Sequence, residues 1–293
     1  MNHRIAVHAL GLAITLPVIG CAQEPPTGAA AEAALNANAL NANALNANAL
    51  NANALSPGGL GVAPLDPLAL DPGARRALQD PGSAGDLSRE LLRYSVSCAL
   101  GAGQSFDFTW TAADGTVNAE SYPGLLGLAP GWATAPLDPA GQQWVSACLA
   151  SRVNAEGVSV QLSSRGTSPQ LATTADERAT FRVREAAFFG NLFTSDPVVY
   201  ACYDVLTMTA AQLKHRVCAQ PQLLDLTLGS LSLGYDCGPI EVLGPCAQIL
   251  GLLTLGPCAS HDPTDRYWYN CSPSYGAPVV SSITTFLTGV LPL

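Results

Sequence analysis

Residues 104–122, with the sequence QSFDFTWTAADGTVNAESY, contain the clearest local fold signal in the chain. Aromatic and polar side chains alternate in FDFTW, a period typical of a strand with one buried face. Asp114 and Gly115 form a dipeptide that two-residue hairpin turns favour, and TVNAESY then returns as a second strand. The segment therefore predicts a β-hairpin in which Trp110 lies opposite Ala119.

Helices are predicted on both sides of this hairpin. Residues 86–100, DLSRELLRYSVSCAL, combine Asp86 or Ser88 as an N-cap with apolar residues at helical spacing. The second helical segment, DPAGQQWVSACLASRVN, begins with Asp138 as a cap, followed by proline at the first helical position. Short strands and loops follow. Residues 86–293 therefore predict an α+β fold, a single disulfide-stapled domain with two N-terminal helices flanking a β-hairpin.

Residues 1–20 have the layout of a signal peptide. One arginine precedes an apolar run that is too short to span a bilayer, and a small residue closes the run. The run ends in Val18-Ile19-Gly20-Cys21, which resembles the lipobox of bacterial lipoproteins. The resemblance implies cleavage between Gly20 and Cys21 and a diacylglyceryl group on the Cys21 thiol. An ordinary secretory signal followed by an unrelated cysteine is the alternative.

A lipidated Cys21 would hold the chain on a membrane without a transmembrane helix. Each buried CH2 contributes about 0.8 kcal/mol, and stable attachment takes more than one acyl chain such as palmitate. Ala22 is not the Asp that retains many lipoproteins at the inner membrane, so the resemblance favours the outer membrane. We expect a cell-envelope protein whose membrane partner is reached through this lipid, with no other cofactor.

The cysteines also indicate export. Without Cys21 their number is even, and an even count in an exported protein predicts a disulfide framework. The remaining cysteines are Cys98, Cys148, Cys202, Cys218, Cys237, Cys246, Cys258 and Cys271. If sequence neighbours pair, the bridges are Cys202–Cys218, Cys237–Cys246 and Cys258–Cys271, with Cys98–Cys148 joining the two helices. We expect no metal site, because the closely spaced cysteine pairs of zinc sites are missing.

A pentapeptide repeat, NANAL, fills residues 36–55. On a helix, successive leucines of this repeat would be about 140° apart, so the period suits neither a helix nor a strand. Pentapeptide-repeat β-helices are the structured alternative, but they carry Ala where Asn38 stands before Leu40. Four repeats would also make only about one coil of such a helix. We therefore expect residues 21–85 to form a lipid-anchored, low-complexity tether.

Several segments resemble a set of uncharacterised envelope lipoproteins of myxobacteria. In order along the chain they are ELLRYSVSCAL, YPGLLGLAPGW, QQWVSACLASRVN, FFGNLF and VYACY. Those proteins likewise carry Asn- and Leu-rich repeats ahead of a cysteine-rich head, and the resemblance spans residues 36–275. It implies an envelope location and no particular activity.

The sequence contains no recognisable catalytic motif, and we assign no catalytic residue. It has no GxSxG, HExxH, GxxxxGK[ST] or GxGxxG pattern. His215 and His261 lie in charged or turn-like stretches, which favours surface positions. Paired carboxylates are the remaining catalytic alternative, because glycosidases need only two at the right separation. Glu90, with Asp107 or Glu120 on the hairpin, echoes the layout of lysozymes, an analogy of fold alone.

An aromatic run is the better candidate for a binding surface. Tyr267, Trp268 and Tyr269 lie between Cys258 and Cys271, and aromatic faces stack on sugars or on partner proteins. In a strand, alternate residues would point inward, and covering a small disulfide core is the alternative role.

Two functions are therefore open. One is a tethered module that binds a glycan or an envelope protein, or is purely structural. The other is a hydrolase of polysaccharide or peptidoglycan. Nucleic acid is not an expected partner, because the net charge is −9 and no basic run is present.

Overall fold

The computed structural model describes residues 45, 47–50, 55–154, 159–207, 216, 218, 237–247, 256–273, 279 and 281–289. The chain divides into two compact units, Met1–Ala34 and Leu35–Leu293, and every described residue belongs to the second unit. The predicted signal peptide, its cleavage site at Gly20, the lipidation site Cys21 and His215 lie outside the described residues.

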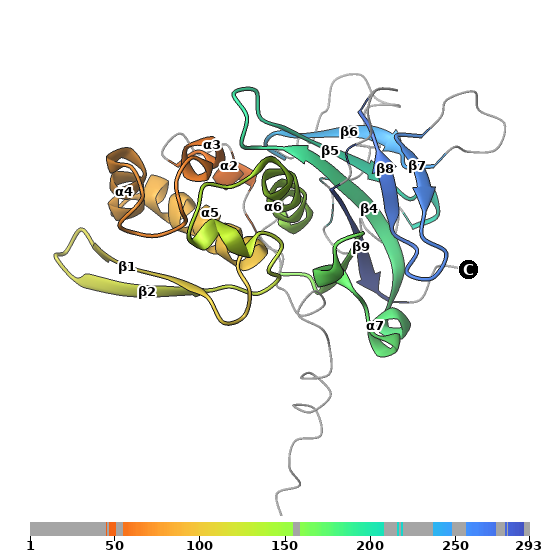
Figure 1. Ribbon diagram of the computed structural model, residues 1–293, viewed down its shortest axis with the longest axis horizontal. Helices are drawn as coiled ribbons and strands as arrows, with labels where there is room; N and C mark the ends of the chain where they lie inside the picture. Colours follow the sequence, from red (N-terminus) through yellow and green to blue (C-terminus); the bar gives the residue numbers. More distant parts are fainter. Residues whose placement is uncertain are drawn as a thin grey trace, which may run out of the picture. The chain divides into compact units, whose positions relative to one another are not determined.

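The second unit contains both helices and strands, which confirms the α+β class (Figure 1). The α-helices are α2 (Ala47–Leu50), α3 (Pro57–Gly61), α4 (Pro72–Gln79), α5 (Ser83–Ala99), α6 (Pro139–Arg152) and α7 (Ala175–Thr180). The described residues also form the short 3-10 helices η1 (Pro130–Ala133), η2 (Pro169–Leu171) and η3 (Val205–Thr207).

Helix α6 begins where its capping residues predict, whereas α5 begins earlier than expected. The Asp138 carboxylate accepts a hydrogen bond from Gly141 N at 2.6 Å, and proline takes the first helical position. Helix α5 starts at Ser83 instead of near residue 86. The predicted cap Ser88 lies inside the helix, where its hydroxyl donates to the Ala84 carbonyl at 2.8 Å.

The main sheet has five strands in the order β3-β9-β4-β5-β6. Its neighbours pair antiparallel except β5 and β6, which are parallel. The strands are β3 (Leu162–Arg165), β4 (Phe181–Asn191), β5 (Val198–Tyr203), β6 (Ile240–Pro245) and β9 (Ser282–Thr288). Two separate two-stranded ribbons are β1 (Ser105–Thr111) with β2 (Val117–Pro123), and β7 (Cys258–His261) with β8 (Trp268–Cys271).

Both faces of the main sheet are covered. On β4, Ala186 and Phe188 join the core that contains α5 and α6, whereas Ala187 and Phe189 join a second core with Trp268. Figure 1 shows α6 on one side of the sheet and the β7–β8 ribbon on the other. The run AAFF on β4 is fully buried because its alternate side chains enter different cores.

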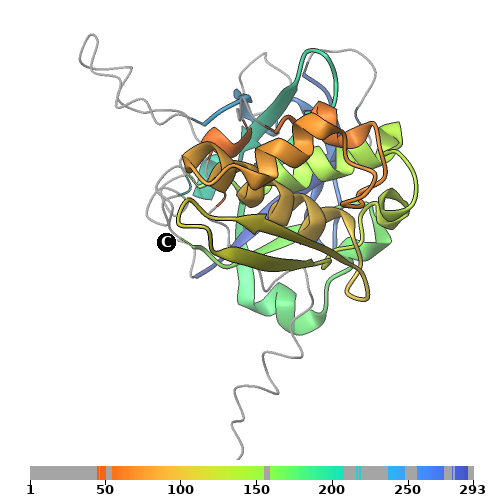
Figure 2. The same cartoon turned by 90° about the vertical axis from the view of Figure 1, so that its left-hand side faces the viewer.

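The predicted hairpin forms, but its register differs by one residue. Trp110 pairs with Asn118 and not with Ala119. The loop is longer than a two-residue turn, because Ala112 N donates to Thr116 O and Gly115 N donates to Ala112 O. Gly115 has φ +87°, the left-handed conformation that closes three-residue hairpin loops. The hairpin packs against α4 and α5, which lie beside it in Figure 2.

The expected tether is wrong for its described part, residues 45, 47–50 and 55–85. From residue 45 to residue 70 a leucine stands at every fifth position, and these leucines are all buried: Leu45, Leu50, Leu55, Leu60, Leu65 and Leu70 are at most 5% exposed. The same leucine spacing continues past the NANAL repeat, so the repeat is the start of a longer pattern. Each buried leucine side chain contributes roughly 1.5–3 kcal/mol, which favours a packed segment over a free coil.

Backbone hydrogen bonds also tie this segment to the rest of the unit. Leu45 N donates to Arg152 O at 3.2 Å, and Leu65 N donates to Trp132 O at 2.7 Å. The Trp132 indole in turn donates to Ala63 O at 3.0 Å. The folded head therefore starts no later than residue 45, and the predicted boundary at residue 86 is corrected.

All eight cysteines of the second unit form disulfides, and two of the four bridges are the predicted ones. Cys98–Cys148 joins α5 to α6, and Cys258–Cys271 closes the β7–β8 ribbon. The other bridges are Cys202–Cys246 and Cys218–Cys237, so the expected pairs Cys202–Cys218 and Cys237–Cys246 are wrong. The parallel pairing of β5 with β6 explains the difference, because it brings the Cys202 and Cys246 Cα atoms within 4.8 Å.

Candidate functional site

The aromatic run predicted as a binding surface lies at the start of β8. Trp268 points inward and is 5% exposed, whereas Tyr267 and Tyr269 are partly exposed. Successive side chains of a strand point to opposite sides, which separates the tryptophan from its neighbours. The tyrosine ring centroids are 6.1 Å apart in an edge-to-face arrangement. The exposed candidate surface is thus Tyr267 with Tyr269, here called the tyrosine pair, without Trp268.

Trp268 anchors this surface to the sheet. Its backbone N–H donates to the Thr284 hydroxyl at 2.7 Å, and its carbonyl accepts from the Ser282 hydroxyl at 2.9 Å. The Arg184 guanidinium lies 4.2 Å from the ring centroid, on the sheet side. These contacts fix β8 on β9 and β4, so the tyrosine pair has a rigid support.

The turn before the tyrosine pair is closed by one carboxylate. Asp262 accepts hydrogen bonds from Thr264 N at 2.8 Å and from Asp265 N at 2.6 Å. Asp262 N donates to Tyr267 O at 2.8 Å, which completes the turn. Partial burial, and next the negative charges of Asp262 and Asp265, raise the pKa of Tyr267. Its hydroxyl therefore remains protonated at neutral pH and can donate a hydrogen bond.

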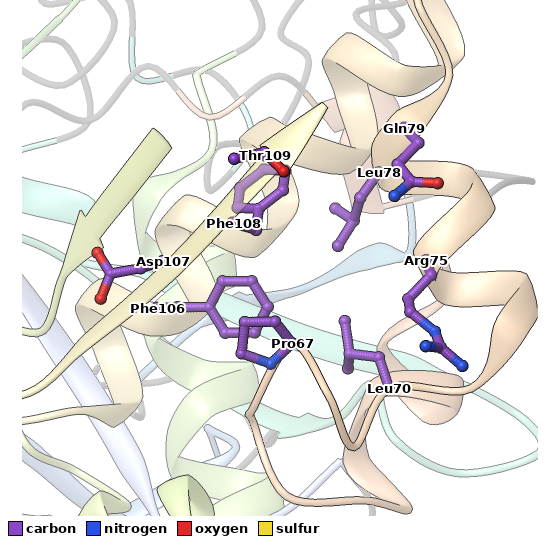
Figure 3. Close-up of a pocket in the computed structure, with 9 residues that line it drawn as sticks. All are labelled: Pro67, Leu70, Arg75, Leu78, Gln79, Phe106, Asp107, Phe108 and Thr109. Atoms are coloured by element: carbon purple, nitrogen blue, oxygen red, sulfur yellow. The ribbon is translucent and has the colours of Figure 1, made fainter. Parts of the chain in front are cut away.

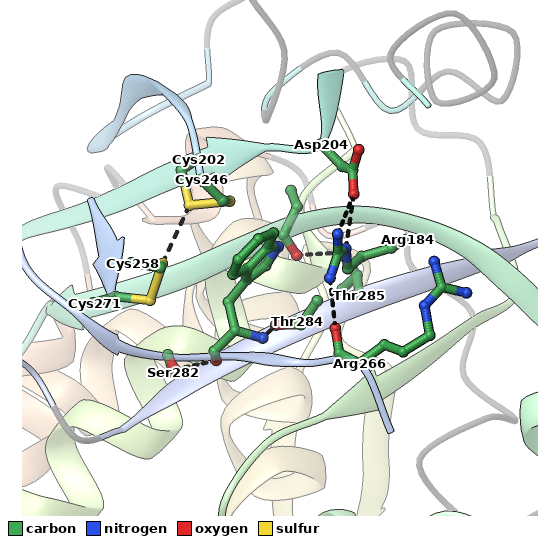
Figure 4. The surroundings of a disulfide bond; sticks show 12 residues. Arg184, Cys202, Asp204, Cys246, Cys258, Arg266, Cys271, Ser282, Thr284 and Thr285 are labelled. Carbon is green, nitrogen blue, oxygen red and sulfur yellow. Dashed lines mark hydrogen bonds and ion pairs between the residues drawn. A yellow bond between two sulfur atoms is a disulfide. The ribbon is translucent and has the colours of Figure 1, made fainter. Parts of the chain in front are cut away.

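The disulfide that closes the ribbon touches a second disulfide, which joins β5 to the residue after β6 (Figure 4). Cys202–Cys246 and Cys258–Cys271 are both buried, and the Cys202 and Cys258 sulfurs are 3.5 Å apart. The sulfurs of Cys202, Cys246 and Cys258 lie within 4.8 Å of one another, which is close enough for three free thiolates to bind one metal ion. All three are consumed in disulfides, however, and metal coordination needs thiolates. In this oxidised form the cluster is a cross-link for the ribbon.

The hairpin carboxylates do not converge on a reacting centre. Glu120 pairs with Phe108 and shares its face, whereas Asp107 pairs with Ser121 on the opposite face. Glu120 accepts hydrogen bonds from the Trp110 indole and the Tyr122 hydroxyl, so both of its oxygens are used. Hydrogen bonds from Ser121 and then Ser105 lower the pKa of Asp107, the opposite of what a general acid needs.

The remaining sequence candidates are Glu90 and His261. Glu90 lies on α5 and is partly buried. His261 is exposed and packs edge-on against Trp268, with ring centroids 5.3 Å apart. His261 forms no hydrogen bond with a serine, threonine or cysteine side chain among the described residues.

A hollow of about 330 Å³ lies between α4 and β1 (Figure 3). Leu70, Leu78, Phe106 and Phe108 give it an apolar lining, and Arg75 stands at its rim. The sequence could not indicate this site, because Leu70 and Leu78 belong to the segment expected to be a tether. The available signals were the alternation of Phe106 and Phe108 and the leucine spacing that includes Leu70.

No protein-family model, curated protein or solved structure matches this chain. Within the part of the chain that the structure describes, no helix is long and apolar enough to cross a membrane.

Proposed function

We propose that this chain is a cell-envelope lipoprotein whose folded unit is a surface-binding module. The lipobox-like sequence supports attachment through acylated Cys21, with the outer membrane favoured by Ala22. The disulfides support an exported location, since such bonds persist in oxidising compartments. The module binds a glycan or an envelope protein through the tyrosine pair.

The observation that carries the binding role is the tyrosine pair itself. Two partly exposed rings stand together on a ribbon closed by a disulfide and anchored by Trp268. Rigid aromatic side chains supply contact area at low entropic cost, which suits recognition of a sugar ring or a protein surface.

The binding test uses the oxidised full chain with peptidoglycan and a panel of bacterial polysaccharides. Protein that pellets with the glycan and soluble fragments detected by mass spectrometry are measured together. Tyr267→Ala and Tyr269→Ala should each weaken binding roughly 3- to 10-fold, because stacking is lost. Tyr267→Phe and Tyr269→Phe, which keep the rings, should retain most of it.

Leu206→Ala is the control, because Leu206 is 84% exposed on η3, outside the ribbon. Equal losses in the control and the tyrosine variants would contradict a role for the tyrosine pair. Released fragments would favour the hydrolase alternative. If neither binding nor release occurs, a protein partner or a structural role is left.

The lipid anchor is tested by growing producing cells with an alkyne-tagged fatty acid. The wild-type chain should carry the tag and fractionate with membranes. Cys21→Ala should lose both the tag and the membrane association, because the acceptor thiol is missing. Tag incorporation that survives Cys21→Ala would overturn the assignment of Cys21.

A further inference from the structure

Strand β1 has one edge that no described strand covers. Ala112 N bonds to Thr116 O, and Gly124 N bonds to Gln104 O, which fixes the phase of the β1–β2 ladder. In an antiparallel pair the bonded positions alternate, so the N–H and C=O groups of Asp107 and Thr109 point away from β2. Among the described residues these backbone groups have no hydrogen-bond partner.

This edge lacks two of the residue types that commonly protect exposed strands. Edge strands are commonly blocked by lysine, proline or a covering element. The β1 sequence SFDFTWT contains neither lysine nor proline, and its Phe, Thr and Trp residues have high strand propensity. Strand β2, by contrast, ends in Pro123. The open edge of β1 is therefore a template for an added strand.

The hollow between α4 and β1 lies along the same stretch of strand. Its lining includes every residue of β1 from Phe106 to Thr109. The Phe106 and Phe108 rings face Leu70 and Leu78 across it, whereas Figure 3 shows the Asp107 side chain pointing away. An added strand would place alternate side chains toward this apolar lining.

An arginine at the rim of the hollow indicates which charge a bound molecule would carry there. Arg75 is exposed at the rim of the hollow, and its guanidinium forms no ion pair or hydrogen bond within the described part of the chain. Bidentate recognition by arginine suits a carboxylate.

We propose that the β1 edge and the adjoining hollow bind an extended peptide. The peptide would pair with the free backbone groups of Asp107 and Thr109, insert an apolar side chain into the hollow and place a carboxylate at Arg75. Two outward donor–acceptor pairs, one every second residue, match the repeat of another strand better than a compact small molecule. This site is distinct from the tyrosine pair and does not rest on it.

Two proline variants test the pairing. Random ten-residue peptides displayed on phage are selected on the immobilised full chain, and enriched peptides are synthesised for measurement of Kd. Thr109→Pro removes an outward N–H of β1 without removing a bond to β2, because the Thr109 N–H points away from β2. Edge strands tolerate proline at such positions. The partner of Thr109 across the ladder, Ala119, points its own N–H outward from β2, so Ala119→Pro is the matched control.

We expect Thr109→Pro to weaken binding by about tenfold and Ala119→Pro to change it less than about twofold. Arg75→Gln should weaken binding only of peptides that carry a carboxylate. Two N-methylated versions of a selected peptide are compared, one methylated at the odd-numbered amides and one at the even-numbered amides. Only the version that loses the amides facing β1 should lose binding. That last measurement uses the unmodified protein and so remains decisive if Thr109→Pro does not fold.

Three results would overturn the proposal. One is the absence of any enriched peptide, and another is equal loss in the two proline variants. The third is a concentration-dependent dimer that Thr109→Pro abolishes, which would make a second copy of this chain the occupant of the edge.

Discussion

Glu177 is a buried carboxylate with only one hydrogen-bonded oxygen among the described residues. It is fully enclosed on α7 and accepts a hydrogen bond from the Ser163 hydroxyl at 2.6 Å. Its second oxygen has no hydrogen-bond partner within the described residues. Burial raises the pKa of Glu177 above its usual 4.5, although Ser163 and Arg165 act in the opposite direction. Desolvation therefore outweighs the nearby cation at this position.

The raised pKa predicts how stability changes with pH. Below pH 4.5, Glu177 is protonated in both the folded and unfolded states, and its contribution is then most favourable. As pH rises, the unfolded state loses its proton first, so the wild type should lose stability relative to Glu177→Gln. Thermal unfolding of both proteins between pH 4 and 7 measures this difference. Asp176→Asn, on the exposed side of the same helix, should follow the wild type. Parallel curves for wild type and Glu177→Gln would contradict the assignment.

At the scale of elements, the segment from residue 45 to residue 70 behaves as a row of leucine anchors. A buried leucine recurs every five residues, and the described residues of this segment include α2 and α3. Leu68, which departs from the period, is 87% exposed. The spacing itself, and not overall hydrophobicity, therefore separates the packed leucines from the free one.

This pattern predicts that two leucine-to-alanine substitutions lower the free energy of unfolding by different amounts. Leu65→Ala should lower the free energy of unfolding by about 2–5 kcal/mol, because it removes buried methyl groups and leaves a cavity. Leu68→Ala should stay within about 0.5 kcal/mol of the wild type, as surface substitutions usually do. Urea unfolding followed by near-ultraviolet circular dichroism measures both. Equal values for the two variants would return this segment to the role of a tether.

Local signals predicted elements better than they predicted partners. The alternation in FDFTW and the cap at Asp138 were sufficient, because strand pattern and capping are decided by neighbouring residues. The hairpin register was missed by one residue, since Asp114 and Gly115 suit more than one loop length. The pairing of Cys202 with Cys246 depends on the parallel alignment of β5 and β6, which sequence order does not contain.

For the candidate sites, too, local features were predictable from the sequence and contacts between distant segments were not. Strand alternation correctly limited the exposed part of the aromatic run, leaving Tyr267 and Tyr269 outside and Trp268 inside. The hollow beside β1 was not predictable, because its lining joins the hairpin to residues of the expected tether. Contacts between distant segments depend on the whole core, and the five-residue period identifies the core side of a segment without naming its partner.

At the scale of the whole molecule, the described residues between 45 and 85 form one side of the head, here called the wall. Trp132 is 2% exposed and donates its indole hydrogen bond to Ala63 O. Arg89, also buried, donates to the carbonyls of Leu78 and Asp80, each at 2.8 Å. Loss of this wall would leave an indole and a guanidinium without their acceptors, and such groups are costly when buried.

Two truncated chains test whether the head needs this wall. A chain that starts at residue 45 should unfold cooperatively and keep a near-ultraviolet spectrum from Trp132 in a packed site. A chain that starts at residue 86 should lose that spectrum and bind the dye ANS, because the surface covered by the leucine row becomes exposed. Both chains keep all four disulfides, so a difference between them reports on packing and not on cross-linking. Equal stability of the two chains would place the boundary near residue 86 and make the leucine row dispensable for folding.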